Sequence, residues 1–354
     1  MRFTTGRVFG ALLLAAAVSS PAKAQDRVQV HGYLTQGYGS ATDYPIYGIS
    51  TDGTADYRTL ALQGRVFLTS SDQVVTQISN QRLGNSLFMQ FEDDVALDWL
   101  FYQRRFLGNS VRAGRVPMPR GLFNEVRDVG TILPFFRASK AFYSEGVETV
   151  DGVTLSRSFD LGAWTADATA FYGRFDVRAE ITDETGLTVA DNKWVGSVGG
   201  QLTISTPVPG VRFGGSWLKA HIKNTTTPTR LWTLYADGSF ERFFVRGEYE
   251  IARQTDYRYQ AYYAQGGANL WKGLWFNGQA EFNTNTVGGI PQLGELVIPS
   301  IKDYAGGLSY RVNSHLTLKG EWHTFKGYQV GVPLSPFGPP VKDKYFIVGI
   351  AAAF

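Results

Sequence analysis

The chain has 354 residues and no cysteine, which excludes disulfide bonds and thiolate metal sites. Its 34 Lys and Arg residues outnumber its 31 Asp and Glu residues only because the first 24 positions hold three basic residues and no acidic one. Residues 25–354 therefore carry no net charge, and a neutral chain gives no reason to expect nucleic acid or an anionic membrane surface as a partner.

The start of the chain has the pattern of an export signal. Arg2 and Arg7 precede a short apolar stretch over residues 8–18, which is followed by the small-residue site Ala22-Lys23-Ala24. We expect a secretory signal peptide over residues 1–24, cleaved after its last residue or one residue later. An N-terminal anchor is the alternative, but the apolar stretch is well short of the roughly 20 residues that a spanning helix needs. No other stretch approaches that length, which excludes a helical inner-membrane protein.

From Val28 onward, apolar and polar residues alternate in segments that turns separate. In residues 274–282, for example, Leu, Phe, Gly, Ala and Phe alternate with Trp, Asn, Gln and Glu, and residues 243–251 and 316–322 repeat the pattern. A strict period of two predicts β-strands. Glycines recur among the apolar residues, where a packed core would need volume, so we expect this face to contact lipid and the polar face to line water. These glycines are Gly196, Gly200, Gly215, Gly247, Gly278 and Gly306.

The connections alternate between short turns and longer loops. The seven short turns are expected at residues 70–72, 107–110, 160–162, 207–210, 237–239, 271–273 and 313–314. The eight longer loops are expected at residues 40–56, 83–94, 118–146, 176–192, 224–229, 254–257, 286–301 and 326–342. This alternation predicts a transmembrane antiparallel β-barrel of about 16 strands, with fourteen or eighteen strands as alternatives.

The final residues fit the same architecture. Residues 344–354 predict a strand that places Phe346, Val348, Ile350, Ala352 and Phe354 toward lipid. We expect this strand to pair with the first, because an open edge in hydrocarbon leaves backbone groups unpaired. A terminal Phe after alternating apolar residues also resembles the C-terminal signature of outer-membrane barrels.

One loop, residues 117–146, differs from the others in length and charge. It follows Gly114-Arg115-Val116 and begins with Pro119-Arg120-Gly121-Leu122-Phe123-Asn124-Glu125, and then Arg127-Asp128. These residues resemble a branch of the bacterial porins in which Gly-Arg-Val-Lys leads into Pro-x-Gly-Leu-Tyr-Asn-Glu and Arg-Asp. This sequence departs from that pattern at two positions, with Pro117 in place of the Lys and Phe123 in place of the Tyr.

The resemblance implies a trimeric sixteen-stranded outer-membrane barrel whose third loop folds inward and narrows the pore. Opposed acidic and basic groups across a narrow wet gap select solutes by charge and size. The expected loop charges are Arg120, Glu125, Arg127, Asp128, Arg137, Lys140 and Glu145. We expect Arg65, Arg104 and Arg112 to form the basic wall opposite the loop, and further lumen-lining charges to be Arg246, Glu248, Lys319 and Glu321. The alternative is a loop that covers the mouth or meets another subunit.

Two other kinds of site are open alternatives. Ser158 or Asp98 would be the residues of a barrel hydrolase, but no catalytic or phosphate-binding sequence motif accompanies them. Glu92-Asp93-Asp94 is a candidate for a divalent cation, a lipopolysaccharide bridge or a subunit contact, against a simply solvated acidic loop.

The aromatic residues predict two girdles at the membrane interfaces. The expected members are Trp99, Trp164, Trp194, Trp217, Trp271, Trp322 and Tyr345. The competing interpretation is an aromatic track for sugar inside the lumen, which would use Trp275 or Tyr262.

The sequence therefore predicts an exported barrel for passive diffusion of small hydrophilic solutes and ions. We expect no cofactor and no bond chemistry, and the expected partners are outer-membrane lipid and lipopolysaccharide, the solutes and two further copies of the chain. A solute-specific channel for a sugar, an organic acid or phosphate is the alternative within transport.

Overall fold

The structure is a computed structural model that describes residues 27–84, 95–143, 147–183, 186–290, 294–328 and 338–354. It confirms the count of sixteen strands. They are β1 (Val28–Ala41), β2 (Thr54–Phe67), β3 (Asp72–Leu83), β4 (Ala96–Phe106), β5 (Asn109–Pro117), β6 (Thr149–Leu161), β7 (Trp164–Asp183), β8 (Gly186–Ser205), β9 (Val211–Ile222), β10 (Pro228–Ser239), β11 (Phe243–Gln254), β12 (Tyr257–Trp271), β13 (Leu274–Ile290), β14 (Gly294–Asn313), β15 (Leu316–Gly327) and β16 (Val341–Ala353). Within the described ranges, the single helical element is one 3-10 turn, η1 (Asn124–Val126), and no helix there is long and apolar enough to cross a membrane.

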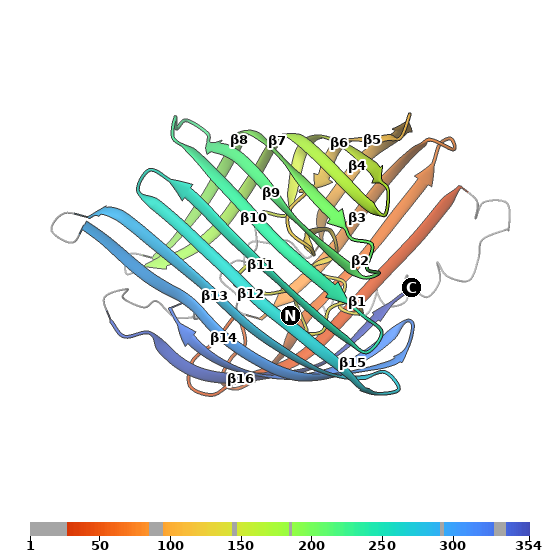
Figure 1. Cartoon of the computed structure of the whole chain (residues 1–354). Coiled ribbons are helices and arrows are strands. Elements are labelled where there is room, and N and C mark those ends of the chain that lie inside the picture. The colour runs from red at the N-terminus through yellow and green to blue at the C-terminus, as the bar shows by residue number, and fades with distance from the viewer. Residues whose placement is uncertain (1–26, 85–94, 144–146, 184–185, 291–293, 329–337) are drawn as a thin grey trace, which may run out of the picture.

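Each strand pairs antiparallel with its neighbours in the chain, and the sheet closes between its first and last strands (Figure 1). The register there runs from Tyr33 opposite Ala353 to Ala41 opposite Tyr345. Backbone hydrogen bonds between Gly32 and Phe354 in both directions extend the pairing to the last residue. The expected closure is confirmed, and every strand has two partners.

The two faces of the sheet differ as the alternation predicts. In β15, Lys319, Glu321 and His323 are buried on the inner face, whereas Leu318 and Trp322 are 44% and 53% exposed on the outer face. The expected small outer-face residues also occur, since Gly278 and Gly306 have open space where a side chain would start. Gly196 is different, because its φ of 59° places it in a bulge between Val195 and Val198.

The aromatic girdle is only partly as expected. Four of its members lie on the outer face and are exposed: Trp164, Trp217, Trp271 and Trp322. Trp99 and Trp194 instead pack against an internal apolar cluster, and Tyr345 is 3% exposed against His323. Their strand parity turns them inward, which proximity to a strand end does not reveal.

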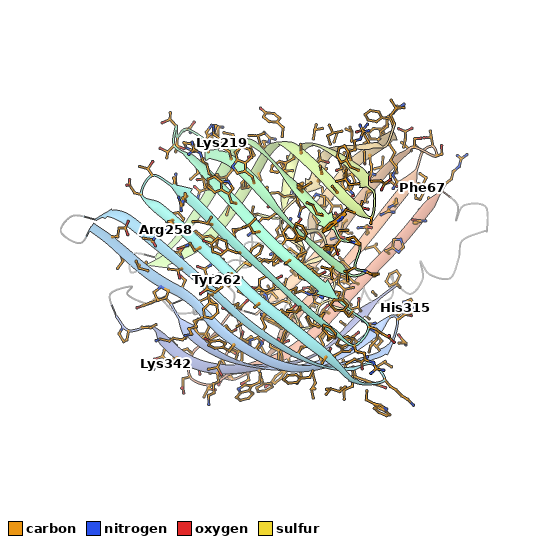
Figure 2. All side chains as sticks on the ribbon, in the orientation of Figure 1. Phe67, Lys219, Arg258, Tyr262, His315 and Lys342 are labelled. Carbon is orange, nitrogen blue, oxygen red and sulfur yellow. The ribbon has the colours of Figure 1, made fainter. Side chains whose placement is uncertain are left out.

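The connections define two ends of the barrel. Phe67 and His315 lie toward the short-turn end, while Lys219, Arg258 and Lys342 lie toward the opposite, long-loop end (Figure 2). The turns were predicted closely, except that the one expected at residues 237–239 occupies residues 240–242. Two of the expected loops are mostly strand: residues 176–192 and 286–301 extend β7, β8, β13 and β14 beyond their neighbours.

Apolar side chains fill part of the inner side near the long-loop end. In one cluster, Ile46 and Ile49 of the first loop pack with Tyr57, Phe325 and Phe136. A second cluster lies along β3 to β11 and belongs to the inner face of those strands. Its buried members are Val75, Phe101, Val116, Met118, Val150, Phe171, Phe175, Leu218, Ala220, Leu231 and Ala252. The inner face is therefore not uniformly polar.

Candidate functional site

The segment between β5 and β6, residues 118–148, is held by a buried ion pair with β11. Arg120 donates from Nε and Nη2 to the two carboxylate oxygens of Glu250, at 2.6 and 2.7 Å, and the two side chains are 3% and 2% exposed. The same guanidinium donates to the carbonyl oxygen of Phe142 at 2.7 Å and lies over its ring. Bidentate, charge-assisted bonds of this kind fix orientation as well as position.

A second carboxylate of β11 receives three donors. Glu248 accepts the backbone N–H of Leu122 at 2.9 Å and the hydroxyls of Tyr143 and Tyr263 at 2.6 and 2.5 Å. Gly121, which precedes Leu122 in the chain, has a φ of 61°. There is no room for a side chain at Gly121, because Glu248 and Tyr143 lie too close. Glycine is required here because the backbone adopts a left-handed conformation in close contact with the wall.

Strands β13 and β15 hold the later part of the segment. Glu281 accepts the Ser139 hydroxyl at 2.5 Å, and Glu321 accepts the backbone N–H of Phe136 at 2.7 Å. Lys319 donates to the carbonyl oxygens of Leu133 and Phe135, at 2.7 and 2.5 Å. Strands β11, β13 and β15 are not neighbours of β5 or β6 in the barrel, so these bonds join the segment to a remote part of the wall.

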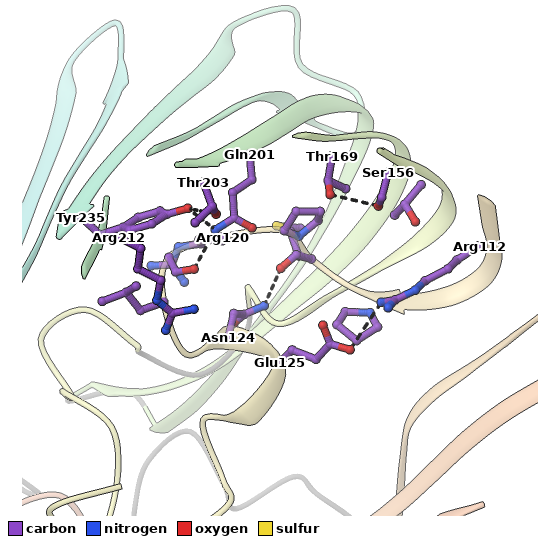
Figure 3. Close-up of a pocket in the computed structure, with 16 residues that line it drawn as sticks. Arg112, Arg120, Asn124, Glu125, Ser156, Thr169, Gln201, Thr203, Arg212 and Tyr235 are labelled. Atoms are coloured by element: carbon purple, nitrogen blue, oxygen red, sulfur yellow. Dashed lines mark hydrogen bonds and ion pairs between the residues drawn. The ribbon is translucent and has the colours of Figure 1, made fainter. Parts of the chain in front are cut away.

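A pocket of about 230 Å³ lies between the start of this segment and the inner face of β5 to β10 (Figure 3). Its wall is mostly hydroxyl and amide groups, contributed by Thr154, Ser156, Thr169, Gln201, Thr203 and Tyr235. Gln201 donates to the carbonyl oxygen of Gly121 at 2.7 Å, which fixes one side of the pocket.

Three charged groups of this pocket, Arg112, Glu125 and Arg212, remain in contact with water. Arg112 approaches Glu125 at 3.4 Å, and the Glu125 side chain is 57% exposed. Arg212, 45% exposed, lies 3.2 Å from Asp237, which also pairs with Arg246 at 3.2 Å. A half-buried Arg112 and the exposed Arg212 and Glu125 therefore border this space.

A group of carboxyls lies on another side of the segment. Burial raises the pKa of Asp128 to about 7; Arg127 lowers it, and Glu148 and Asp98 raise it further by charge repulsion. Glu148 pairs with Arg127 at 3.0 Å, and Asp98 accepts from Gln77 at 2.7 Å. Asp128 therefore changes its charge near neutral pH.

The structure brings some of the expected charges together and separates others. Arg112 and Glu125 meet as expected, and Arg65 has the inner-face parity of its strand. Arg104 was expected to face the lumen, and this is wrong: it lies on the outer face beside Asp72 at 3.8 Å and is 61% exposed. The sequence Gln103-Arg104-Arg105 has basic residues on both faces, and Arg105 is the one with inner parity.

Several expected pore charges are buried rather than facing water. Arg120, Arg127 and Lys140 are 3%, 8% and 3% exposed. Arg137 donates to the Tyr57 hydroxyl at 3.2 Å. The expected lumen-lining residues Glu248, Lys319 and Glu321 face inward but are covered by the segment that they bind. Glu145 and Glu92-Asp93-Asp94 lie outside the described residues.

Sequence reasoning missed the anchoring role of Glu250 and Glu281 and the exposed Arg212. Their signal is present as acidic or basic residues at the inner-face positions of β11, β13 and β9. What the pattern does not show is which of these positions the segment covers.

The alternatives to a channel find little support in the geometry. Ser158 bonds to Asp167 in a groove whose lining contains no His, and Asp98 is held by Gln77 and Ser79. The described ranges contain no group of three or more His, Asp or Glu suited to a metal ion. Tyr262 was expected on the lumen face, and this is wrong: it is 45% exposed and stacks on Phe282 outside.

Comparison with solved structures defines the fold. OmpF of Salmonella typhi, in a complex with daunomycin, is similar with a TM-score of 0.61 and 11% identity over 92% of this chain and 97% of that one. An anion-selective porin from Comamonas acidovorans has a TM-score of 0.54 and 14% identity over 92% and 99%. A mutant of the Rh. blastica porin has a TM-score of 0.56 and 10% identity over 92% and 100%.

The chain therefore has the fold of the Gram-negative outer-membrane porins, as its sequence resemblance implied. No family model and no curated protein matches the sequence.

Proposed function

We propose that this chain is an outer-membrane porin, exported by its signal peptide, for passive diffusion of small hydrophilic solutes and ions. The observation that carries the proposal is the space between the segment 118–148 and the inner wall. There, the exposed Glu125 meets Arg112 beside a wall of hydroxyl and amide groups. Mixed charges around a water-filled gap orient polar solutes and filter them by size and charge. The proposed channel uses no cofactor and makes or breaks no bond.

In this proposal the segment 118–148 narrows the lumen. The bonds of Arg120 to Glu250 and of Lys319 to two loop carbonyls support this role, because inner-face side chains of remote strands receive the segment. Since these anchors are buried, selection depends on the charges that remain exposed. We assign it to Arg112, Glu125 and Arg212, with Asp128 adding negative charge above neutral pH.

We further propose that the chain works as a homotrimer. One of the similar structures is an outer-membrane protein of Vibrio cholerae described in a trimer form, with a TM-score of 0.56 and 8% identity over 92% of this chain. Molar mass by light scattering of the detergent-solubilised barrel tests this assignment. A monomer that conducts as well as the oligomer would contradict any need for assembly.

The channel is tested by single-channel recording of the refolded barrel in a planar bilayer under a salt gradient. Large stable steps are expected, and Glu125→Gln is expected to shift the reversal potential toward anions without changing the fold, because this side chain is 57% exposed. Glu295→Gln is the matched control, since Glu295 is exposed and lies on β14 away from the pocket. A folded barrel without current would refute the proposal. Saturable block by one sugar, organic acid or phosphate would favour a solute-specific channel instead.

A further inference from the structure

A second cavity inside the barrel lies beside a later part of the segment 118–148. Its volume is about 360 Å³, and it is bordered by residues 131–134, by the turn after β10 and by the inner face of β11, β13, β14 and β15 next to the short turns. We call this space the short-turn cavity. None of its lining residues borders the pocket beside Arg112. The two spaces also differ in chemistry, because aromatic rings take the place of the hydroxyl and amide wall.

Two aromatic rings form the floor of the short-turn cavity. Phe244 of β11 and Trp275 of β13 belong to strands that are two apart in the barrel, yet their ring centroids lie within 6.0 Å, with 41° between the planes. Gly267 of β12 is paired with Phe244, and a side chain at Gly267 would clash with the Phe244 ring. The missing side chain at this inner-face position therefore lets the two rings meet. Their spacing is that of an interacting aromatic pair.

The segment 118–148 supplies the opposite wall. Ile132 and Pro134 border the cavity, and Ile132 is 50% exposed, whereas Leu133 between them is buried. Lys319 holds this stretch through the carbonyl oxygen of Leu133, and Asn277 donates to the carbonyl oxygen of Pro134 at 3.4 Å. The short-turn cavity thus has apolar groups on two sides and a preformed shape, which is typical of pockets for small ligands.

One exposed cation borders the same space. Arg311 follows Ser309 by two positions on the inner face of β14, and Ser309 is paired in register with Trp275. Arg311 is exposed and forms no ion pair with another residue in the described ranges. An arginine without a carboxylate partner can bind a planar anionic group through two parallel hydrogen bonds.

The other charged groups of the cavity leave the charge of Arg311 uncancelled. Arg246 is 12% exposed, lies 3.2 Å from Asp237 and is placed over the Phe244 ring, 4.4 Å from the ring centre. Glu241 is exposed in the turn between β10 and β11, so three strand spacings, about 14 Å along the wall, separate it from β14. This distance exceeds the Debye length of about 8 Å at physiological ionic strength, so salt screens Glu241 from Arg311.

We propose that the short-turn cavity binds an aromatic carboxylate. The aromatic ring of the ligand lies between the rings of Phe244 and Trp275 and the side chains of residues 132–134, and its carboxylate accepts N–H groups of Arg311. Contacts between aromatic rings favour a flat ring over an aliphatic ring of the same size. A sugar would leave hydroxyl groups unpaired against the apolar groups on the two sides of the cavity, which is costly. This ligand differs from the small hydrophilic solutes of the proposed channel, on which the site rests only for the route into the lumen.

The test measures binding of benzoate to the detergent-solubilised barrel by saturation-transfer NMR, which detects binding without any current. Benzamide has the same ring without the charge, and benzoate is expected to bind about tenfold more tightly than benzamide. Cyclohexanecarboxylate has the same charge without aromatic faces, and benzoate is expected to bind about fivefold more tightly than this compound. Glucose should not displace benzoate.

Two variants assign the binding to this cavity, each with a matched control. Arg311→Gln should weaken binding of benzoate about tenfold and leave binding of benzamide unchanged, and Arg311→Lys should restore most of the affinity. Its control is Arg242→Gln, since Arg242 is exposed in the neighbouring turn but does not line the cavity. Trp275→Leu should weaken binding of benzoate about fivefold and leave binding of cyclohexanecarboxylate unchanged. Its control is Trp271→Leu, since Trp271 is 65% exposed on the outer face.

Equal binding of benzoate and benzamide would overturn the proposal, as would unchanged binding in Arg311→Gln. Displacement of benzoate by glucose, or equal losses in the cavity and control variants, would overturn it as well. Because Arg311 is exposed, its replacement by Gln leaves the packing of the cavity intact, so a loss of binding is not a loss of fold. A barrel that conducts but does not bind benzoate refutes this site alone, whereas one that binds benzoate without conducting refutes the channel alone.

Discussion

Replacing Arg120 by Met would leave Glu250 as a buried carboxylate without its partner. In the intact protein the pair is 3% and 2% exposed, with bonds of 2.6 and 2.7 Å. Removing one member of a buried pair costs about 3–5 kcal/mol, because the other charge stays in a dry environment. Glu250 regains water only when the segment 118–148 leaves the wall. The cost therefore destabilises the docked state of the segment. It shifts the equilibrium from the docked toward the undocked segment by about two to four powers of ten.

We expect Arg120→Met to produce larger or rapidly fluctuating single-channel currents. The control is the double variant Arg120→Met, Glu250→Met, since replacing both members of a buried pair by apolar side chains is often neutral or stabilising. Steady currents near the wild-type size are expected from the double variant. If Arg120→Met alone also gives steady currents of wild-type size, the buried pair does not hold the segment, and the reasoning is refuted.

Three further predictions concern the same segment. The pKa of Asp128 is raised to about 7, so the folded protein binds the carboxyl proton of Asp128 more tightly than the unfolded chain does. The free energy of unfolding should therefore fall from about pH 4 to pH 7 and then level off. Urea titrations should show that Asp128→Asn flattens this dependence on pH, and an unchanged dependence would contradict the prediction. Gly121→Ala should destabilise the docked segment by about 1–3 kcal/mol. The control Gly162→Ala lies at a left-handed position with open space around it, so it should cost only its backbone strain. Equal losses of stability in thermal unfolding of the two variants would show that the contact of Gly121 with the wall is unimportant. Lys319→Met leaves two buried loop carbonyls unpaired, which costs about 1–3 kcal/mol for each carbonyl. Amide hydrogen exchange in residues 133–136 should therefore increase. Unchanged exchange there would count against Lys319 as an anchor of the segment.

The fold was predictable because a barrel in lipid satisfies strong local rules. Every strand residue faces either lipid or the interior, so alternation in sequence reports directly on the face. The loop expected at residues 176–192 is where the alternation rule was not followed far enough. In β7, Val177, Ala179 and Ile181 alternate with Arg178 and Glu180, and the backbone pairs there up to Asp183. Alternation was the better signal, since a strand that rises above the membrane no longer needs an apolar outer face.

The site was less predictable because parity places a side chain inside without saying what covers it. Glu248 and Lys319 have the expected inner parity, but both end on the segment 118–148 rather than in water. Arg104 and Arg105 are adjacent, and assigning the wrong one to the interior requires an error of only one residue in register. Contacts between a loop and a remote strand depend on three-dimensional closure, for which a single sequence contains no local signal.

The inner charges divide into two groups according to their partners. Glu248, Glu250 and Lys319 are ionisable groups on a dry surface, which is costly unless each finds hydrogen bonds, and the segment supplies those bonds. They specify the position of the segment and are unavailable to a passing ion. Arg112 and Arg212 keep water contact, and in the proposed channel they would define the electric field that a solute meets. On that proposal, selectivity follows from the few charges that folding leaves exposed, so that even a neutral chain can form a selective passage.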